Sequence, residues 1–153
     1  MTDNTAISAH VPLAGELGAQ GHILPVRVYW EDTDAGGIVY HANYLKFMER
    51  ARTDYLRLLG VHQSQLQRNT GITLAVSRMN IAFRQPAVLD DLVQVVSVFA
   101  AIGGASLTLA QKVLRGNAVL AQASVTVAAL REGRPVRLPP DLRALFAAQE
   151  QKC

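Results

Sequence analysis

Apolar and polar residues recur along this chain in patterns that predict a strand followed by one long helix. Residues 25–30 alternate after a proline, which indicates a strand. From Tyr44 to Leu59 apolar residues recur every three or four positions, which predicts an apolar helix of about 16 residues. Asn43 stands where an N-cap is expected, and Gly60 stands where the helix should end. A short second helix is expected over residues 64–69.

The remaining pattern predicts four strands in succession, over residues 72–84, 91–101, 106–115 and 119–127. The last of these has a clear period of two, with Val119, Ala121, Ala123, Val125 and Val127 on one face. Turn signals between the strands favour consecutive antiparallel hairpins, and residues 139–141 open a short terminal helix. One apolar helix and one half-buried sheet can cover each other, so an α+β domain is expected.

Length and cysteine content limit the classes of protein that fit. The 153 residues suit one domain with a real core and are too few for a TIM barrel. Residues 1–22 show no sustained period and are interpreted as a poorly ordered N-terminal extension, and residues 23–153 as the single domain. The single cysteine, Cys153, argues against an internal disulfide and a cysteine-rich zinc site, so no metal is expected.

The net charge of +3 includes only three lysines, and the arginines are scattered, which does not resemble a nucleic-acid-binding surface. No basic segment precedes an apolar run, and no apolar run approaches 18 residues. Neither a secretory signal nor a membrane span is therefore expected. A cytoplasmic location is expected, peripheral to the inner membrane only through partners.

The densest cluster of chemically active residues is EDTDAGGIVYHANY, residues 31–44, just before the long helix. A helix N-terminus offers free N–H groups to an oxygen that gains negative charge, and Gly36 and Gly37 allow close approach of a ligand. A nearby carboxylate could attack an acyl carbon or deprotonate a water molecule. The same residues are also ordinary turn formers, and His41 could simply bond backbone at the helix start, so the pattern alone leaves both interpretations open.

Other motifs are missing from this segment and from the rest of the chain. A calcium loop beginning at Asp32 would need Glu at its twelfth position, where Asn43 stands. The sequence contains no HExxH, no GxGxxG and no P-loop.

Residues 26–52, VRVYWEDTDAGGIVYHANYLKFMERAR, resemble the hot-dog-fold thioesterases of the 4-hydroxybenzoyl-CoA thioesterase family. They are most similar to its YbgC-type acyl-CoA thioesterases, which are associated with the Tol-Pal system. The similarity spans residues 25–145 and includes Arg78-Met79, Gln85-Pro86-Ala87, Asp90-Asp91 and Leu138-Pro139. It implies a curved antiparallel sheet wrapped around one long central helix. It also implies a homodimer as the minimum active unit, with active sites at the dimer interface, and a tetramer as the expected assembly.

The resemblance implies hydrolysis of acyl-CoA to free acid and CoA, with CoA as part of the substrate and no cofactor. Asp34 corresponds to the catalytic carboxylate, as nucleophile or general base. The backbone N–H near His41 corresponds to the donor that polarises the carbonyl, and the His41 side chain is a candidate for orienting water or transferring a proton. The implied substrate-binding positions are Tyr29, Gly37, Val39 and Tyr40.

The chain departs from the family at one turn, and other functions stay open. Some relatives have basic residues that bind the CoA phosphates at this turn, whereas residues 101–106 include none. Arg131, Arg134 and Arg137 could bind the phosphates instead. A run of solvated charges is the more ordinary interpretation of these three arginines. An acyl carrier protein is an alternative acyl donor. A non-catalytic scaffold of the envelope and cell-division machinery is a second hypothesis, and a dehydratase that uses a helix histidine is a third.

Overall fold

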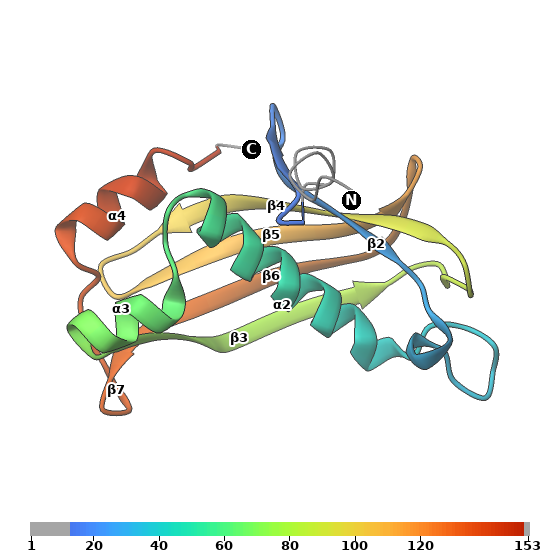
Figure 1. Cartoon of the computed structure of the whole chain (residues 1–153), viewed down its shortest axis with the longest axis horizontal. Coiled ribbons are helices and arrows are strands. Elements are labelled where there is room, and N and C mark those ends of the chain that lie inside the picture. The colour runs from blue at the N-terminus through green and yellow to red at the C-terminus, as the bar shows by residue number, and fades with distance from the viewer. Residues whose placement is uncertain (1–12, 152–153) are drawn as a thin grey trace, which may run out of the picture.

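The computed structural model describes residues 13–151 (Figure 1). Residues 1–12, which belong to the expected extension, and Cys153 lie outside the described residues. In chain order the elements are β1 (Glu16–Gly18), β2 (Gly21–Arg27), the 3-10 turn η1 (Trp30–Asp32), α2 (His41–Leu58), α3 (Gln63–Thr70), β3 (Ile72–Phe83), β4 (Leu92–Ile102), β5 (Ser106–Arg115), β6 (Ala118–Arg131), β7 (Arg134–Pro135) and α4 (Pro140–Ala147). Within residues 13–151, no helix combines the length and hydropathy that a membrane crossing requires.

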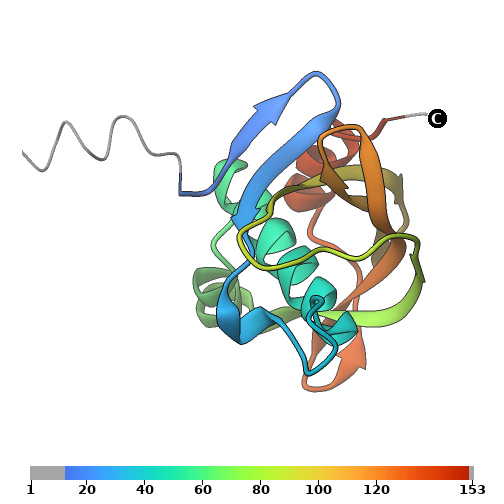
Figure 2. The same cartoon turned by 90° about the vertical axis from the view of Figure 1, so that its right-hand side faces the viewer.

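One antiparallel sheet, in the order β1-β2-β4-β5-β6-β3, curves around α2, with β7 added to β6 (Figures 1 and 2). The predicted α+β hot-dog architecture is confirmed. Consecutive hairpins are correct for β4, β5 and β6 but wrong for β3, which pairs with β6 at the far edge. The connection over residues 84–91 is long enough to pass the start of α2, so strands adjacent in sequence need not be adjacent in the sheet.

The apolar faces that the patterns predict make up the core. The buried side chains of α2 include Tyr44, Phe47, Met48, Ala51 and Tyr55. The period-two face of β6 is confirmed from Ala121 to Val127, but Val119 is only half-buried. A register shift opposite Val113 and Leu114 buries Leu120 instead, because a bulge reverses the alternation.

Three expected boundaries are wrong. The helix begins at His41 with Tyr40 as N-cap, and the Asn43 side chain instead donates to the Asp32 carbonyl at 2.8 Å. The first long strand covers residues 21–27 because its pairing with β4 starts at His22, and the chain then tightens into η1. The boundary of the extension at residue 22 is too late, since β1 and the first two residues of β2 already belong to the sheet. This hairpin is rich in glycine, so its sequence shows no alternation of apolar and polar residues that would predict the strands.

Candidate active site

A tight hairpin between η1 and α2 carries Asp34. Thr33 and Val39 form a bridge, the Asp34 N–H donates to Ile38 O at 2.9 Å, and the Gly37 N–H donates to Asp34 O at 3.0 Å. Gly37 has φ +79°, a conformation that favours glycine. Asp34 Oδ1 accepts the Gly36 N–H at 2.8 Å, so the turn interpretation holds for this oxygen. Within residues 13–151 its other oxygen, Oδ2, has no hydrogen-bond partner and remains open to a ligand.

The hairpin leads directly into an uncapped helix start. Tyr40 makes no side-chain cap, and the Asn43 N–H closes on Tyr40 O at 2.8 Å. The N–H groups of His41 and Ala42 find no acceptor among the residues that the structure describes. They therefore lie at the positive end of an 18-residue helix, where an oxyanion is stabilised.

Hydrogen bonds to the backbone fix the relation between the hairpin and the helix. The Asp32 carbonyl accepts both the Tyr40 N–H at 2.9 Å and the Asn43 side chain. The Asp32 carboxylate accepts the Tyr29 N–H at 2.8 Å. Of the three clustered carboxylates, Asp32 thus has a structural role, whereas Asp34 is exposed and has a free oxygen.

Beside the helix start lies a depression of about 260 Å³, lined by Ile38, Val39, His41, Tyr44, Phe83, Arg84, Gln85 and Pro86. The His41 ring contacts the Tyr40 ring, with centroids 4.7 Å apart, and meets Phe83 edge-on at 5.9 Å. The structure thus brings His41 and Val39 together with residues that follow β3. Gly37 and Tyr40 lie on the same hairpin segment, whereas Tyr29 precedes η1 with its side chain exposed. Val39 itself is buried and belongs mainly to the core.

The residues that sequence analysis missed come from the end of β3 and the connection that follows it. Phe83, Gln85 and Pro86 line the depression, and the buried Ala87 donates its N–H to the Tyr44 hydroxyl at 3.0 Å. Burial raises the pKa of Tyr44, so this hydroxyl stays protonated at neutral pH. The Gln85-Pro86-Ala87 segment carries part of the family resemblance, which was the one available signal, but it assigns no role.

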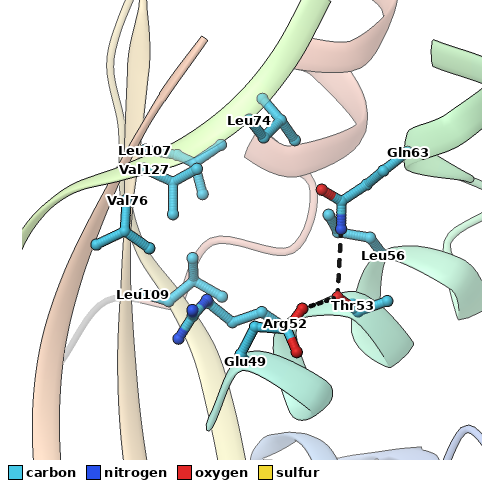
Figure 3. Close-up of a pocket in the computed structure, with 10 residues that line it drawn as sticks. All are labelled: Glu49, Arg52, Thr53, Leu56, Gln63, Leu74, Val76, Leu107, Leu109 and Val127. Carbon is cyan, nitrogen blue, oxygen red and sulfur yellow. Dashed lines mark hydrogen bonds between the residues drawn. The ribbon is translucent and has the colours of Figure 1, made fainter. Parts of the chain in front are cut away.

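A second cavity, of about 140 Å³, lies between α2, α3 and the sheet (Figure 3). Its walls are mainly Leu56, Leu74, Val76, Leu107, Leu109 and Val127, with Glu49, Arg52, Thr53 and Gln63 as the polar members. The Thr53 hydroxyl donates to Glu49 at 2.9 Å and accepts from the Gln63 amide at 3.3 Å. Glu49 follows His41 by eight residues, about 12 Å along the helix, so this cavity is separate from the depression at the helix start.

At the opposite end of the molecule, the turn that lacks basic residues in sequence has arginines beside it. Arg143 Nε donates to Gly103 O at 3.1 Å, and a Cβ placed on Gly104 would lie 3.8 Å from Arg137 Nη1. Both arginines line a hollow of about 490 Å³ with the first turns of α4. Arg137 is one of the candidates from sequence; Arg131 instead donates to Thr70 O, and Arg134 lies exposed in β7.

Comparisons with known proteins identify the family of this chain. The sequence model of the thioesterase-like superfamily matches residues 28–146. The acyl-CoA thioesterase YbgC of Haemophilus influenzae is 42% identical over 128 residues, which cover 82% of this chain and 94% of that protein. The acyl-CoA thioester hydrolase YbgC of Escherichia coli is 38% identical over 125 residues, covering 80% and 92%.

Solved structures show the same relation. A probable thioesterase from Bartonella henselae is 37% identical and superposes with a TM-score of 0.74, covering 77% of this chain and 98% of that one. The region matched by the superfamily model contains the hairpin, α2 and strands β3 to β7. The chain therefore belongs to the hot-dog proteins of the thioesterase-like superfamily.

Proposed function

We propose that this protein hydrolyses acyl-CoA thioesters to the free acid and CoA. One observation carries the proposal. The hairpin that presents a free Asp34 oxygen leads directly into the start of α2, where the N–H groups are uncapped. Similarity to proteins named acyl-CoA thioesterases supports the same chemistry. A cytoplasmic location is proposed because acyl-CoA is present there.

In the proposed reaction, the thioester carbonyl oxygen binds at the N–H groups of His41 and Ala42. Asp34 Oδ2 either attacks the carbonyl carbon or removes a proton from the water that does. Attack by Asp34 would form a mixed anhydride and expel the CoA thiolate, and water would then hydrolyse the anhydride. In both routes the helix start stabilises the oxyanion, and a single such donor contributes about 3–4 kcal/mol. The His41 ring would orient water or protonate the thiolate.

The acyl group is proposed to enter the depression beside His41, whose apolar wall includes Ile38 and Phe83. Gly37 and Tyr40 would contact the thioester from the hairpin, and Tyr29 would contact it from the preceding turn. The CoA phosphates are proposed to bind the arginines beside the turn at Gly103 and Gly104, Arg137 and Arg143. The start of α4 and the turn between β4 and β5, beside which these arginines lie, are at the opposite end of the molecule from the hairpin (Figure 1), so a second copy would have to supply the arginines.

A homodimer formed through β3 would bring the two regions together. β3 is 12 residues long and ends the sheet, so its outer edge has no strand partner within residues 13–151. Such an edge, with Val76 and Phe83 exposed, favours pairing with a second β3. Antiparallel pairing would set the Phe83 end of one copy beside the Ile72 end of the other. A tetramer would combine two such dimers. Light scattering tests this, because the measured mass should be two or four times the chain mass of 16.6 kDa.

The test is thiol release from acyl-CoAs of two to eighteen carbons, benzoyl-CoA and 4-hydroxybenzoyl-CoA. Asp34→Asn should lower kcat by about 10²–10⁴-fold, because the variant has neither a nucleophile nor a base at this atom. Glu31→Gln, three residues away and also exposed, is the matched control and should retain activity.

Other outcomes separate the alternatives. Absence of turnover by the wild type on every acyl-CoA would contradict the proposal, and acyl carrier protein thioesters would then be the next substrates. Partner capture unaffected by Asp34→Asn would favour the scaffold. An inactive His41→Ala variant beside a nearly active Asp34→Asn variant would favour a dehydratase.

A further inference from the structure

The connection over residues 84–91 lines the depression with Arg84, Gln85 and Pro86, and it hydrogen-bonds the hairpin and the helix start through Ala87. Ala87 is fully buried, and both of its backbone polar groups bond the site. Its carbonyl accepts the Val39 N–H at 2.9 Å, and its N–H donates to the Tyr44 hydroxyl at 3.0 Å. Val39 closes the Asp34 hairpin, and Tyr44 lies in the first turn of α2. One residue therefore holds the carboxylate hairpin and the oxyanion-binding helix start at the same time.

The position of Ala87 is in turn fixed by an ion pair at the end of β5. Arg115 Nη1 donates to Asp91 Oδ2 at 2.7 Å and to the Pro86 carbonyl at 3.1 Å, on either side of Ala87. The same Asp91 oxygen accepts the Val88 N–H at 3.0 Å. The Val88 N–H and the Arg115 guanidinium hold the pKa of Asp91 below its usual range, so the carboxylate is charged at neutral pH. The connection is thus clamped across residues 86–91.

A second set of bonds joins this clamp to β2. The Val28 N–H donates to Asp91 O at 2.9 Å, and the Asp90 N–H donates to Val28 O at 3.1 Å. Arg27 Nη1 donates to Asp90 O at 2.7 Å. Asp90 has φ +74°, a strained conformation for a residue with a side chain, and this network holds it. β2 leads into the hairpin. The connection therefore bonds the chain both before the hairpin, at Val28, and after it, at Val39.

We propose that Tyr44, Arg115 and Asp91 are positioning residues for the thioester site, acting through Ala87 to set the Asp34 hairpin against the start of α2. The proposal rests on the proposed function for its kinetic consequence. Displacement of a reacting group by about 1 Å can cost about a hundredfold in rate. The Arg115 and Asp91 side chains are partly exposed at the surface and their effect on the site is indirect, so loss of the clamp should lower kcat more than it raises KM.

The test compares two tyrosines on the same helix. Tyr44 and Tyr55 are both buried, and each hydroxyl makes one hydrogen bond, Tyr44 with Ala87 and Tyr55 with Gln149 at 3.2 Å. Tyr44→Phe should lower kcat about 10–100-fold with KM changed less than threefold, because the displaced groups act in the reaction step. Tyr55→Phe, at the far end of α2, should leave kcat within about twofold of the wild type. Equal kcat values for the two variants would overturn the proposal.

A second pair of variants, at Arg115, tests the clamp without changing a buried side chain. Arg115→Gln should lower kcat, and Arg115→Lys should restore part of it, because lysine keeps the charge beside Asp91 but loses the fixed geometry. Arg68→Gln, at an exposed arginine on α3, is the control. If Tyr44→Phe fails to fold, this series alone decides, and unchanged kcat in Arg115→Gln would overturn the proposal.

Amide hydrogen exchange separates failure of this inference from failure of the proposed function. Exchange at Val39 should accelerate at least tenfold in Tyr44→Phe and Arg115→Gln, and stay unchanged in Tyr55→Phe. This readout needs no substrate. If the wild type hydrolyses no thioester, the proposed function fails, while accelerated exchange still supports the clamp. Unchanged exchange at Val39 in both variants would overturn the clamp whether or not the enzyme is active.

Discussion

The two ends of α2 are held in different ways. At its C-terminal end Tyr55 is buried in an aromatic cluster, stacked on His22 with centroids 5.1 Å apart and tilted against Phe99 at 4.8 Å. At its N-terminal end, hydrogen bonds to Asp32 and Ala87 add to the ring contacts of Tyr44, and His41 is exposed. Aromatic packing excludes solvent and ligand from this end of the helix, whereas hydrogen bonds can fix the backbone while other N–H groups stay open.

This contrast indicates a division of labour along one helix. Burial of large rings stabilises the fold at the end where no ligand is expected. Hydrogen bonds to backbone groups position the other end, where apolar side chains packed over the N–H groups would exclude the substrate. Substitutions at the two ends should therefore separate stability from activity, and the following predictions test that separation.

The largest expected effect is on stability, from Phe99→Ala. Phe99 is fully buried on β4 and also stacks on Phe146 with centroids 5.1 Å apart. Its truncation should lower the free energy of unfolding by about 3–5 kcal/mol, because it leaves a cavity in the core. Urea denaturation measures this change.

The matched control is Phe83, the last residue of β3. Phe83 lies against His41 at the N-terminal end of α2 and is 47% exposed. Phe83→Ala should cost less than about 1 kcal/mol of stability but lower kcat/KM. If Phe83→Ala proves as destabilising as Phe99→Ala while activity is unchanged, the division between the two ends is wrong.

A smaller effect is expected from the arginines proposed for the CoA phosphates. The double variant Arg137→Gln and Arg143→Gln should raise KM for acyl-CoA about tenfold, with kcat unchanged, because it removes binding contacts remote from the reacting atoms. Steady-state kinetics with the corresponding N-acetylcysteamine thioester, which has no phosphates, should show no change. Arg134→Gln is the control, and an unaltered KM for acyl-CoA in the double variant would exclude this phosphate site.

The smallest effect concerns pH and the C-terminal end of α2. His22 Nε2 donates to the Ala14 carbonyl, and its buried Nδ1 has no partner among residues 13–151. Burial lowers the pKa of His22 below 6.5. Because the unfolded chain binds the proton more readily, the free energy of unfolding should fall as pH drops below 6.5. The slope should reach at most about 1.4 kcal/mol per pH unit.

His22→Phe keeps a ring against Tyr55 and removes the titrating group. Denaturation at pH 7.5 and pH 5.5 should show a smaller loss of stability in this variant than in the wild type. An identical loss in both proteins would assign the pH dependence to other groups.

The sequence predicts the α+β layering well because it follows from local periodicity, whereas the hot-dog architecture is implied by the family resemblance. The apolar stripe from Tyr44 to Tyr55 and the alternation in β6 each report which face is buried. What periodicity could not predict depends on contacts between distant residues. β3 pairs with β6 rather than β4, and the hairpin of β1 with β2 is stabilised by burial of His22 against Tyr55.

The candidate site divides in the same way. Asp34, Gly37 and His41 lie within eight residues, so one motif identifies the hairpin and the helix start. Asn43 is not the N-cap, because its side chain bonds the Asp32 carbonyl, a loop group whose location the sequence does not reveal. The roles of Phe83, at the end of β3, and of Ala87, in the connection that follows, depend on contacts with residues more than 40 positions away, which the sequence does not reveal.

The most direct test of the account is kcat/KM of Asp34→Asn for the best acyl-CoA substrate, measured together with its free energy of unfolding. Asp34 is exposed and contributes only a local turn bond, so stability should change by less than about 1 kcal/mol. We predict a loss of about 10²–10⁴-fold in kcat/KM at nearly unchanged stability. An Asp34→Asn variant that keeps wild-type kcat/KM would contradict the assignment of the thioester chemistry to this hairpin.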